Sequence, residues 1–171
     1  MKPTDLDSIL SSTDDSELCD AVFSRFAELN NRINVDSYTE EERVVTLVLH
    51  ATGIIGNGGF QYLFEGEFNG DPGYIHTAAA FETIGASESH AAFQRALGLF
   101  GGRYPPDREQ RIAAYLNVPK DQRDAIERQF YDDEENMRSG LARYIRERRE
   151  RFHQLLSSPP SMWNRLRRLF R

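Results

Sequence analysis

The chain has 171 residues, of which 39% are apolar and 28% charged; these proportions are ordinary for a folded protein and exclude a wholly disordered one. Its one cysteine, Cys19, excludes an internal disulfide and a zinc site built from cysteine pairs. No apolar run has the length of a signal-peptide core or a transmembrane segment, so we expect a cytoplasmic protein.

The net charge of −6 conceals two parts of opposite sign. Residues 1–137 carry 25 acidic and 11 basic side chains, a net charge of −14. Residues 138–171 carry ten arginines and two glutamates, a net charge of +8. An acidic body followed by a basic C-terminal segment suggests an interaction with a charged partner.

Helical periodicity dominates the chain, and no alternation typical of a β-strand is present. Asp15–Ile33 has the apolar stripe of an amphipathic helix. Thr39 and Glu42 form a capping box, which predicts a second helix that runs to Ile55 and ends at the glycines that follow. Further helices are expected over residues 60–67, 72–84, 87–100, 107–116, 121–130, 137–156 and 163–170.

These patterns predict an all-α protein with a single compact domain of about seven to nine helices over residues 1–156. A Ser/Pro linker and a short basic amphipathic tail are expected over residues 157–171. Asp71 and Ser87 are predicted to cap the helices that follow them.

No residue pattern in the chain indicates a catalytic, cofactor or metal site. The four histidines lack a ligand spacing, and His50 is interpreted as a core or interface residue, with a catalytic base as the alternative. Acidic neighbours should raise the pKa of the Cys19 thiol and leave it inert. The acidic run 132–135 is interpreted as a solvated helix start, with a metal site as the alternative.

One set of motifs carries a family resemblance. Asn57-Gly58-Gly59-Phe60 forms its centre, Gly70-Asp71 and Ile84-Gly85-Ala86 follow, and Arg43 precedes it. Over residues 40–152 the chain resembles the bacterial DNA mimic protein 19-like family, a domain of unknown function. The motif residues Asn57, Gly58, Gly59, Phe60, Ile84 and Gly85 are expected to have structural roles.

The resemblance implies an all-helical, non-enzymatic protein without cofactors that uses carboxylates in place of DNA phosphates. The expected partner is a basic or DNA-binding protein, with no direct nucleic-acid binding by the acidic body and with a homodimer left open. An uncharacterised enzyme or a small-ligand-binding helical domain is the alternative. The candidate partner-binding residues, each near a helix start, are Asp14, Asp15 and Glu17; Glu40, Glu41 and Glu42; and Asp132, Asp133, Glu134 and Glu135.

The C-terminal tail is a second candidate binding segment. Trp163, Leu166 and Phe170 share one helical face. Basic amphipathic segments bind anionic lipid, nucleic acid or acidic protein, and the alternative is that the apolar face docks on the domain while the arginines stay solvated. The candidate tail residues are Trp163, Arg165, Arg167, Arg168 and Arg171.

Overall fold

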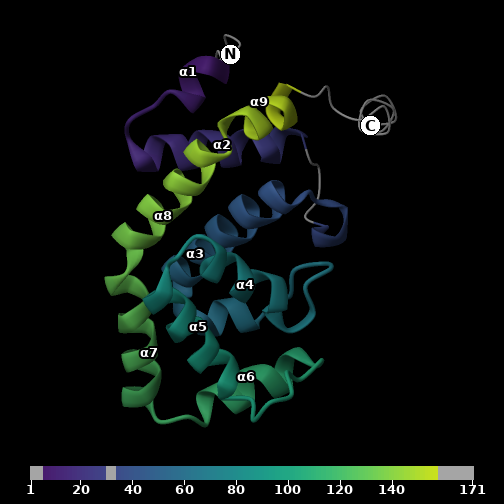
Figure 1. Cartoon of the computed structure of the whole chain (residues 1–171). Coiled ribbons are helices and arrows are strands. Elements are labelled where there is room, and N and C mark those ends of the chain that lie inside the picture. Colours follow the sequence, from purple (N-terminus) through teal and green to yellow (C-terminus); the bar gives the residue numbers. More distant parts are fainter. Residues whose placement is uncertain (1–5, 30–33, 158–171) are drawn as a thin grey trace. The chain divides into compact units, whose positions relative to one another are not determined.

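The computed structural model describes residues 6–29 and 34–157, and these are helical without a named strand, as predicted (Figure 1). Along them, no helix is long and apolar enough to cross a membrane. The α-helices are α1 (Leu6–Leu10), α2 (Asp15–Leu29), α3 (Glu40–Phe64), α4 (Ile75–Thr83), α5 (Ser87–Gly98), α6 (Arg108–Leu116), α7 (Lys120–Asp132), α8 (Glu134–Glu147) and α9 (Arg149–Ser157); short 3₁₀ turns cover Val35–Ser37 and Pro72–Tyr74.

The chain forms two compact units. Unit 1 combines residues 1–33 with residues 138–171, and unit 2 is the continuous stretch 34–137. Helix α8 passes from unit 2 into unit 1 between Met137 and Arg138. The tail residues named above lie outside the described residues, and the domain boundary expected after residue 156 stays a prediction.

Helix α3 begins as predicted, because Thr39 and Glu42 form a reciprocal capping box. The predicted stop at the glycines that follow Ile55 is confirmed, although the helix runs slightly further than expected. The helix continues through Gly56 and is interrupted only at Gly58 and Gly59, whose backbone angles are not helical, before it resumes to Phe64. The expected turn between two helices is therefore a two-residue break within one long element.

The predicted caps of α4 and α5 are confirmed only in part, since a 3₁₀ turn over Pro72–Tyr74 precedes α4 and its N-cap residue is Tyr74. The buried Asp71 carboxylate accepts hydrogen bonds from the amides of His76 at 2.7 Å and Thr77 at 2.9 Å, at the start of α4. Ser87 does not cap α5, whose N-cap residue is Ala86. The carboxylate of Asp133 supplies the missing acceptor, because its Oδ2 binds the Ser89 amide at 2.8 Å.

Unit 2 has an aromatic core. Phe60, Leu63 and Phe64 are at most 1% exposed. The Phe60 ring lies 5.7 Å from that of Phe93 and 5.5 Å from that of Phe130, in edge-to-face geometry. Phe60 thus joins α3 to α5 and α7, the pair of helices that surrounds it.

Unit 1 packs α2 against α9 through Phe26 and Phe152, whose ring centroids are 6.1 Å apart. The predicted single helix over 137–156 is wrong, since α8 starts three residues earlier and a break at Arg148 separates it from α9. Helix α1 was not predicted. Burial raises the pKa of the Cys19 thiol to about 12, so the thiol is inert as expected, with burial rather than neighbouring acids as the main cause.

Candidate functional site

The family motif is built around a carboxylate from a distant helix. Glu127 of α7 points its Oε1 at the break in α3, where it accepts hydrogen bonds from the Phe60 amide at 3.2 Å and the Tyr115 hydroxyl at 2.9 Å. Gly59 has φ +68°, and a Cβ on it would overlap the Glu127 carboxylate. Gly59 is therefore needed for both its backbone angle and its lack of a side chain.

The N-terminal acids predicted to bind a partner are engaged within unit 1. Asp14 Oδ1 accepts from the Glu17 amide at 2.8 Å and so caps α2. Arg146 pairs with Asp15 at 2.7 Å and lowers the pKa of that carboxyl. The Ser12 hydroxyl donates to Glu17 at 2.8 Å. These contacts give all three acids a local structural role.

The acids at the start of α3 differ in their availability. Glu42 is held by the capping box, through its Oε2 to the Thr39 amide at 2.9 Å. Glu41 is half-buried, whereas Glu40 is exposed. This run thus offers one plainly exposed carboxylate to a partner.

The run 132–135 contains three exposed acids and one buried one. Asp132, Glu134 and Glu135 are exposed, but Asp133 is only 4% exposed. Besides the Ser89 amide, Asp133 accepts from the Ser89 hydroxyl at 2.8 Å and from Asn136 at 2.9 Å. Asp133 is therefore not part of the candidate surface, because its carboxylate is buried and hydrogen-bonded inside unit 2.

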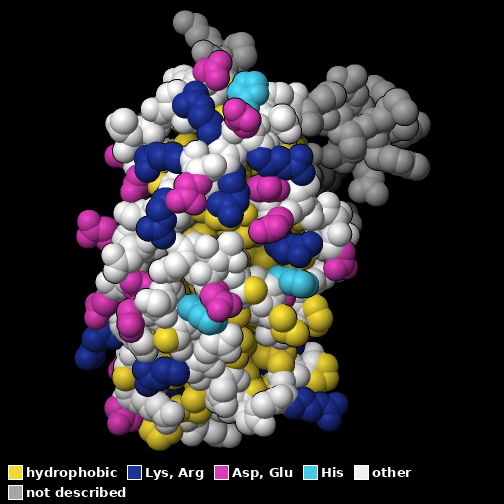
Figure 2. Space-filling view, viewed as in Figure 1, with side chains coloured by type: hydrophobic (Ala, Val, Ile, Leu, Met, Phe, Trp, Pro, Cys, Tyr) yellow, Lys and Arg dark blue, Asp and Glu magenta, His cyan; other side chains and the backbone are white. Residues whose placement is uncertain are grey.

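These hydrogen bonds bring a further acid into the same region. Because Asp133 binds Ser89, the start of α5 lies against the point where α7 passes into α8. Glu88 precedes Ser89 and accepts from Gln129 of α7 at 2.8 Å. In Figure 2, acidic side chains gather along the edge that α7 and α8 form in Figure 1. We name this surface the acidic junction; it consists of Glu88, Asp132, Glu134 and Glu135.

Removal of the Asp133 carboxylate should cost stability without touching the acidic junction. Asp133→Ala leaves the Ser89 amide and hydroxyl without their acceptor, which should lower the free energy of unfolding by about 1–3 kcal/mol. Asp132→Ala is the matched control, because the exposed neighbour should change stability by less than about 0.5 kcal/mol. Denaturant unfolding followed by circular dichroism measures both, and equal effects would contradict the assigned role of Asp133.

The two units differ in how their charges are paired. The described part of unit 1 carries eight acidic and seven basic side chains, and arginines of α8 and α9 pair with N-terminal acids. Arg138 contacts Asp20 at 2.5 Å and Arg149 contacts Asp7 at 3.7 Å, in addition to the Arg146 pair. Within the described residues of unit 1, the arginines of α8 and α9 are thus balanced by acidic side chains.

Unit 2 carries 18 acidic and eight basic side chains, a net charge of −10. Its ion pairs include Arg108 with Glu65 at 2.9 Å and Lys120 with Asp124 at 2.5 Å. A larger group of exposed carboxylates forms no side-chain hydrogen bond or ion pair with any described residue. This group consists of Asp36, Glu40, Glu82, Glu109, Asp121, Asp132, Glu134 and Glu135.

Histidine, cysteine and acidic side chains form no group of three that could hold a metal ion within residues 6–29 and 34–157. His50 is half-buried against Phe68, with ring centroids 6.1 Å apart, and burial lowers its pKa. This environment matches its interpretation as a packed, neutral histidine.

The roles of Glu127 and Glu88 were not predicted from the sequence. Both contacts cross between helices that are distant in the chain, and neither acid stands in a recognisable local motif. The exposure of Ile75 was not predicted either; this side chain is 68% exposed at the start of α4. Ile75 lies outside the apolar stripe of its helix, and that displacement is a signal that the sequence does contain.

The described residues form a small all-helical protein in which unit 2 is acidic. Aspartate and glutamate carboxylates hold its helix starts, and glycines form the break in α3. A family model described as DMP19-like protein matches residues 36–148, and the chain belongs to this family, as the motifs predicted. No curated protein matches the chain, and no solved structure matches it.

Proposed function

We propose that this protein is a non-enzymatic interaction module whose unit 2 binds a basic surface of a DNA-binding protein and acts there as a DNA mimic. The observation that carries the proposal is the net charge of −10 on unit 2, with many exposed carboxylates outside any described ion pair. Membership of the DMP19-like family supports it, because the family resemblance implies that role.

Charge density supports the same proposal. From the scaling of folded chains, a unit of this length has a radius of gyration of about 13 Å, which corresponds to a body roughly 33 Å across. Duplex DNA of that length carries about 19 phosphate charges, at one per ~1.7 Å. Unit 2 carries a net charge about half as large, so a mimic must place its exposed acids toward the partner.

The acidic junction is the part of unit 2 that we propose meets the partner. Its four acids come from two segments more than 40 residues apart, and the Asp133–Ser89 hydrogen bonds fix them next to each other. Basic residues border it: Arg128 lies a helical turn before Asp132 on α7, and Arg95 of α5 donates to the same Gln129 that binds Glu88. A rigid scaffold of this kind holds carboxylates in place without an entropic cost at binding.

A charge-reversal capture experiment tests the proposal. The tagged full chain is used to capture proteins from the native lysate, and the captured proteins are identified and assayed for DNA binding. The triple variant Asp132→Lys, Glu134→Lys and Glu135→Lys should lose the captured partner, and high salt should release it from the unsubstituted chain. Asp133 stays unchanged, because its substitution would disturb the start of α5.

The matched control reverses three exposed acids elsewhere in unit 2, namely Asp36→Lys, Glu109→Lys and Asp121→Lys. It alters the net charge by the same amount but leaves the acidic junction intact, so it should keep most of the capture. Far-ultraviolet circular dichroism must show unchanged helix content for both variants. Equal loss in both would argue against a specific junction, and retained capture in the junction variant would reject the site.

A further inference from the structure

Glu127 carries a half-buried carboxylate that is only partly used inside unit 2. Its Oε1 accepts the hydrogen bonds from Phe60 and Tyr115 described above. Its Oε2 accepts no hydrogen bond and remains accessible, and the carboxylate forms no ion pair with any basic side chain of residues 6–29 and 34–157. A half-buried carboxylate with one open oxygen attracts a cation from outside, because partial burial strengthens the electrostatic interaction.

Two tyrosine rings stand beside this carboxylate. Tyr131 follows Glu127 by four residues, so the two side chains lie on the same face of α7. The Tyr131 ring is 41% exposed, and its hydroxyl donates to the Ile55 carbonyl of α3 at 2.8 Å, which fixes the ring near the break. Burial raises the pKa of the Tyr115 and Tyr131 hydroxyls, and the negative charge of Glu127 raises both further. Glu127 is thus close to both rings.

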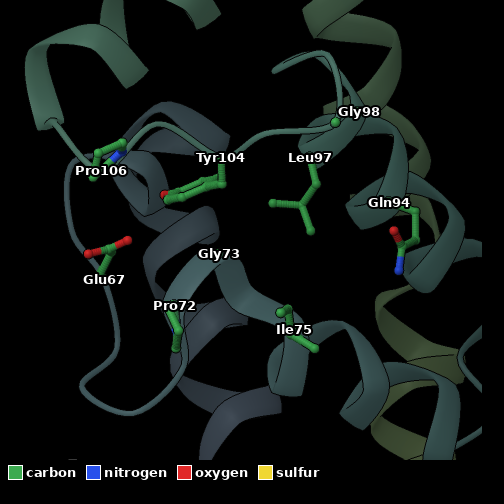
Figure 3. A pocket seen from close by; sticks show the side chains of 10 residues that line it. Glu67, Pro72, Gly73, Ile75, Gln94, Leu97, Gly98, Tyr104 and Pro106 are labelled. Carbon is green, nitrogen blue, oxygen red and sulfur yellow. The ribbon is translucent and has the colours of Figure 1, made fainter.

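Elsewhere in unit 2, an arginine of the chain itself is held by the same pair of groups. Tyr104 and Glu67 lie toward one end of the groove drawn in Figure 3. The Arg111 guanidinium lies over the Tyr104 ring at 5.3 Å and 3.9 Å from the Glu67 carboxylate. A tyrosine ring and a glutamate therefore bind a guanidinium in this fold, and at Glu127 the cation is not supplied by the described part of the chain.

Arg123 is the basic residue that could compete for this place. Its guanidinium lies over the Tyr115 ring at 5.3 Å, and its Nε donates to the Val118 carbonyl at 3.1 Å. It forms no ion pair with Glu127. Arg123 therefore covers the Tyr115 ring, and the exposed Tyr131 ring and the open oxygen of Glu127 are left for a second guanidinium.

We propose that Glu127 and Tyr131 bind one arginine side chain of the basic partner. Arginine suits the pair because its planar guanidinium can stack on an aromatic ring while it donates to a carboxylate. The site borders the acidic junction, since Asp132 follows Tyr131 directly, whereas Arg128 follows Glu127 and so lies on a different side of α7. The partner as the source of the arginine rests on the proposed function; the site itself does not.

Titration with N-acetyl-arginine amide tests the site without the partner. In amide and aromatic NMR spectra of the full chain, the Phe60 amide and the Tyr131 ring should shift in a saturable manner. N-acetyl-citrulline amide has nearly the same shape without the charge and should shift them little. The Tyr104 ring is an internal reference that should not respond, because Arg111 already lies over it.

Variants assign the binding to the two side chains. Glu127→Gln removes the charge but keeps an oxygen for Phe60 and Tyr115, and it should weaken arginine binding by about tenfold or more. Tyr131→Leu should also weaken it, and Tyr131→Phe should retain it because the ring remains. Asp121→Asn, an exposed acid at the start of the same helix, is the matched control and should leave binding unchanged.

Circular dichroism must show unchanged helix content for each variant. Equal shifts with the arginine and citrulline compounds would overturn the proposal, as would unchanged arginine binding in either Glu127→Gln or Tyr131→Leu.

Partner capture separates this proposal from the proposed function. The Glu127→Gln chain should capture several-fold less partner than the unsubstituted chain. If the unsubstituted chain captures no DNA-binding protein, the proposed function fails while the titration still decides the site. If both chains capture the partner equally, the proposed function stands and the assignment of the arginine to that partner is wrong.

Discussion

Phe60→Ala should lower the free energy of unfolding by about 3–5 kcal/mol, the usual cost of deleting a fully buried phenylalanine. The side chain is 0% exposed and its ring contacts Phe93 and Phe130, so the cavity would open where α3 meets α5 and α7. For a chain of this size the midpoint of thermal unfolding should fall by roughly 6–20 °C.

Differential scanning calorimetry and denaturant titration measure the Phe60→Ala effect. Tyr62→Ala is the control on the same helix, since Tyr62 is 52% exposed and should affect stability far less. Because the chain has two compact units, the transition assigned to unit 2 is the one to follow. An unchanged transition in Phe60→Ala would show that the aromatic core is not assembled around this ring.

Gly59→Ala should be the most damaging of the conservative glycine substitutions in α3. Gly59 has φ +68° and ψ −170°, a region nearly confined to glycine, so that a residue with a Cβ there costs about 1–3 kcal/mol, and the Cβ would displace the Glu127 carboxylate. Loss of the Glu127 hydrogen bonds to Phe60 and Tyr115 adds about 1–3 kcal/mol. We expect a total loss of about 2–6 kcal/mol in the free energy of unfolding.

Gly56→Ala is the matched control for Gly59→Ala. Gly56 lies in the same helix, has no left-handed backbone angle, and has no atom within 4 Å of the position that a Cβ would take. Alanine there should stabilise the helix by roughly 0.5–1 kcal/mol. Urea unfolding of the pair should therefore give shifts of opposite sign, and a destabilising effect of equal size at both glycines would refute the explanation of the motif.

The sequence predicts those features of the fold that are determined within a few residues of the chain. The Thr39–Glu42 capping box is local and is present in the structure. The stop at the glycines after Ile55 was predicted correctly, but the sequence alone does not say which of Gly56, Gly58 and Gly59 leaves the helix. The break falls at Gly58 and Gly59, where the Glu127 carboxylate of α7 accepts from the Phe60 amide, and a contact between residues 67 apart in the chain is not visible in any local pattern.

The candidate surface was only partly predictable for the same reason. The acidic run 132–135 is visible in the sequence, but nothing local distinguishes Asp133 from its neighbours. Its burial follows from the approach of Ser89, which is 44 residues away. Likewise, Asp15 is paired with Arg146, and Glu17 accepts a hydrogen bond from Ser12. These contacts do not follow from the interpretation that the N-terminal acids mark a helix start.

A DNA-displacement assay tests whether this acidic protein takes the place of DNA on its partner. The partner identified by capture is bound to fluorescently labelled duplex DNA, and the unsubstituted chain is added while fluorescence anisotropy is followed. We expect that the chain releases the DNA, that the triple variant Asp132→Lys, Glu134→Lys and Glu135→Lys does not, and that release weakens steeply as salt rises. A ternary complex in which partner, DNA and chain remain bound together would contradict the claim.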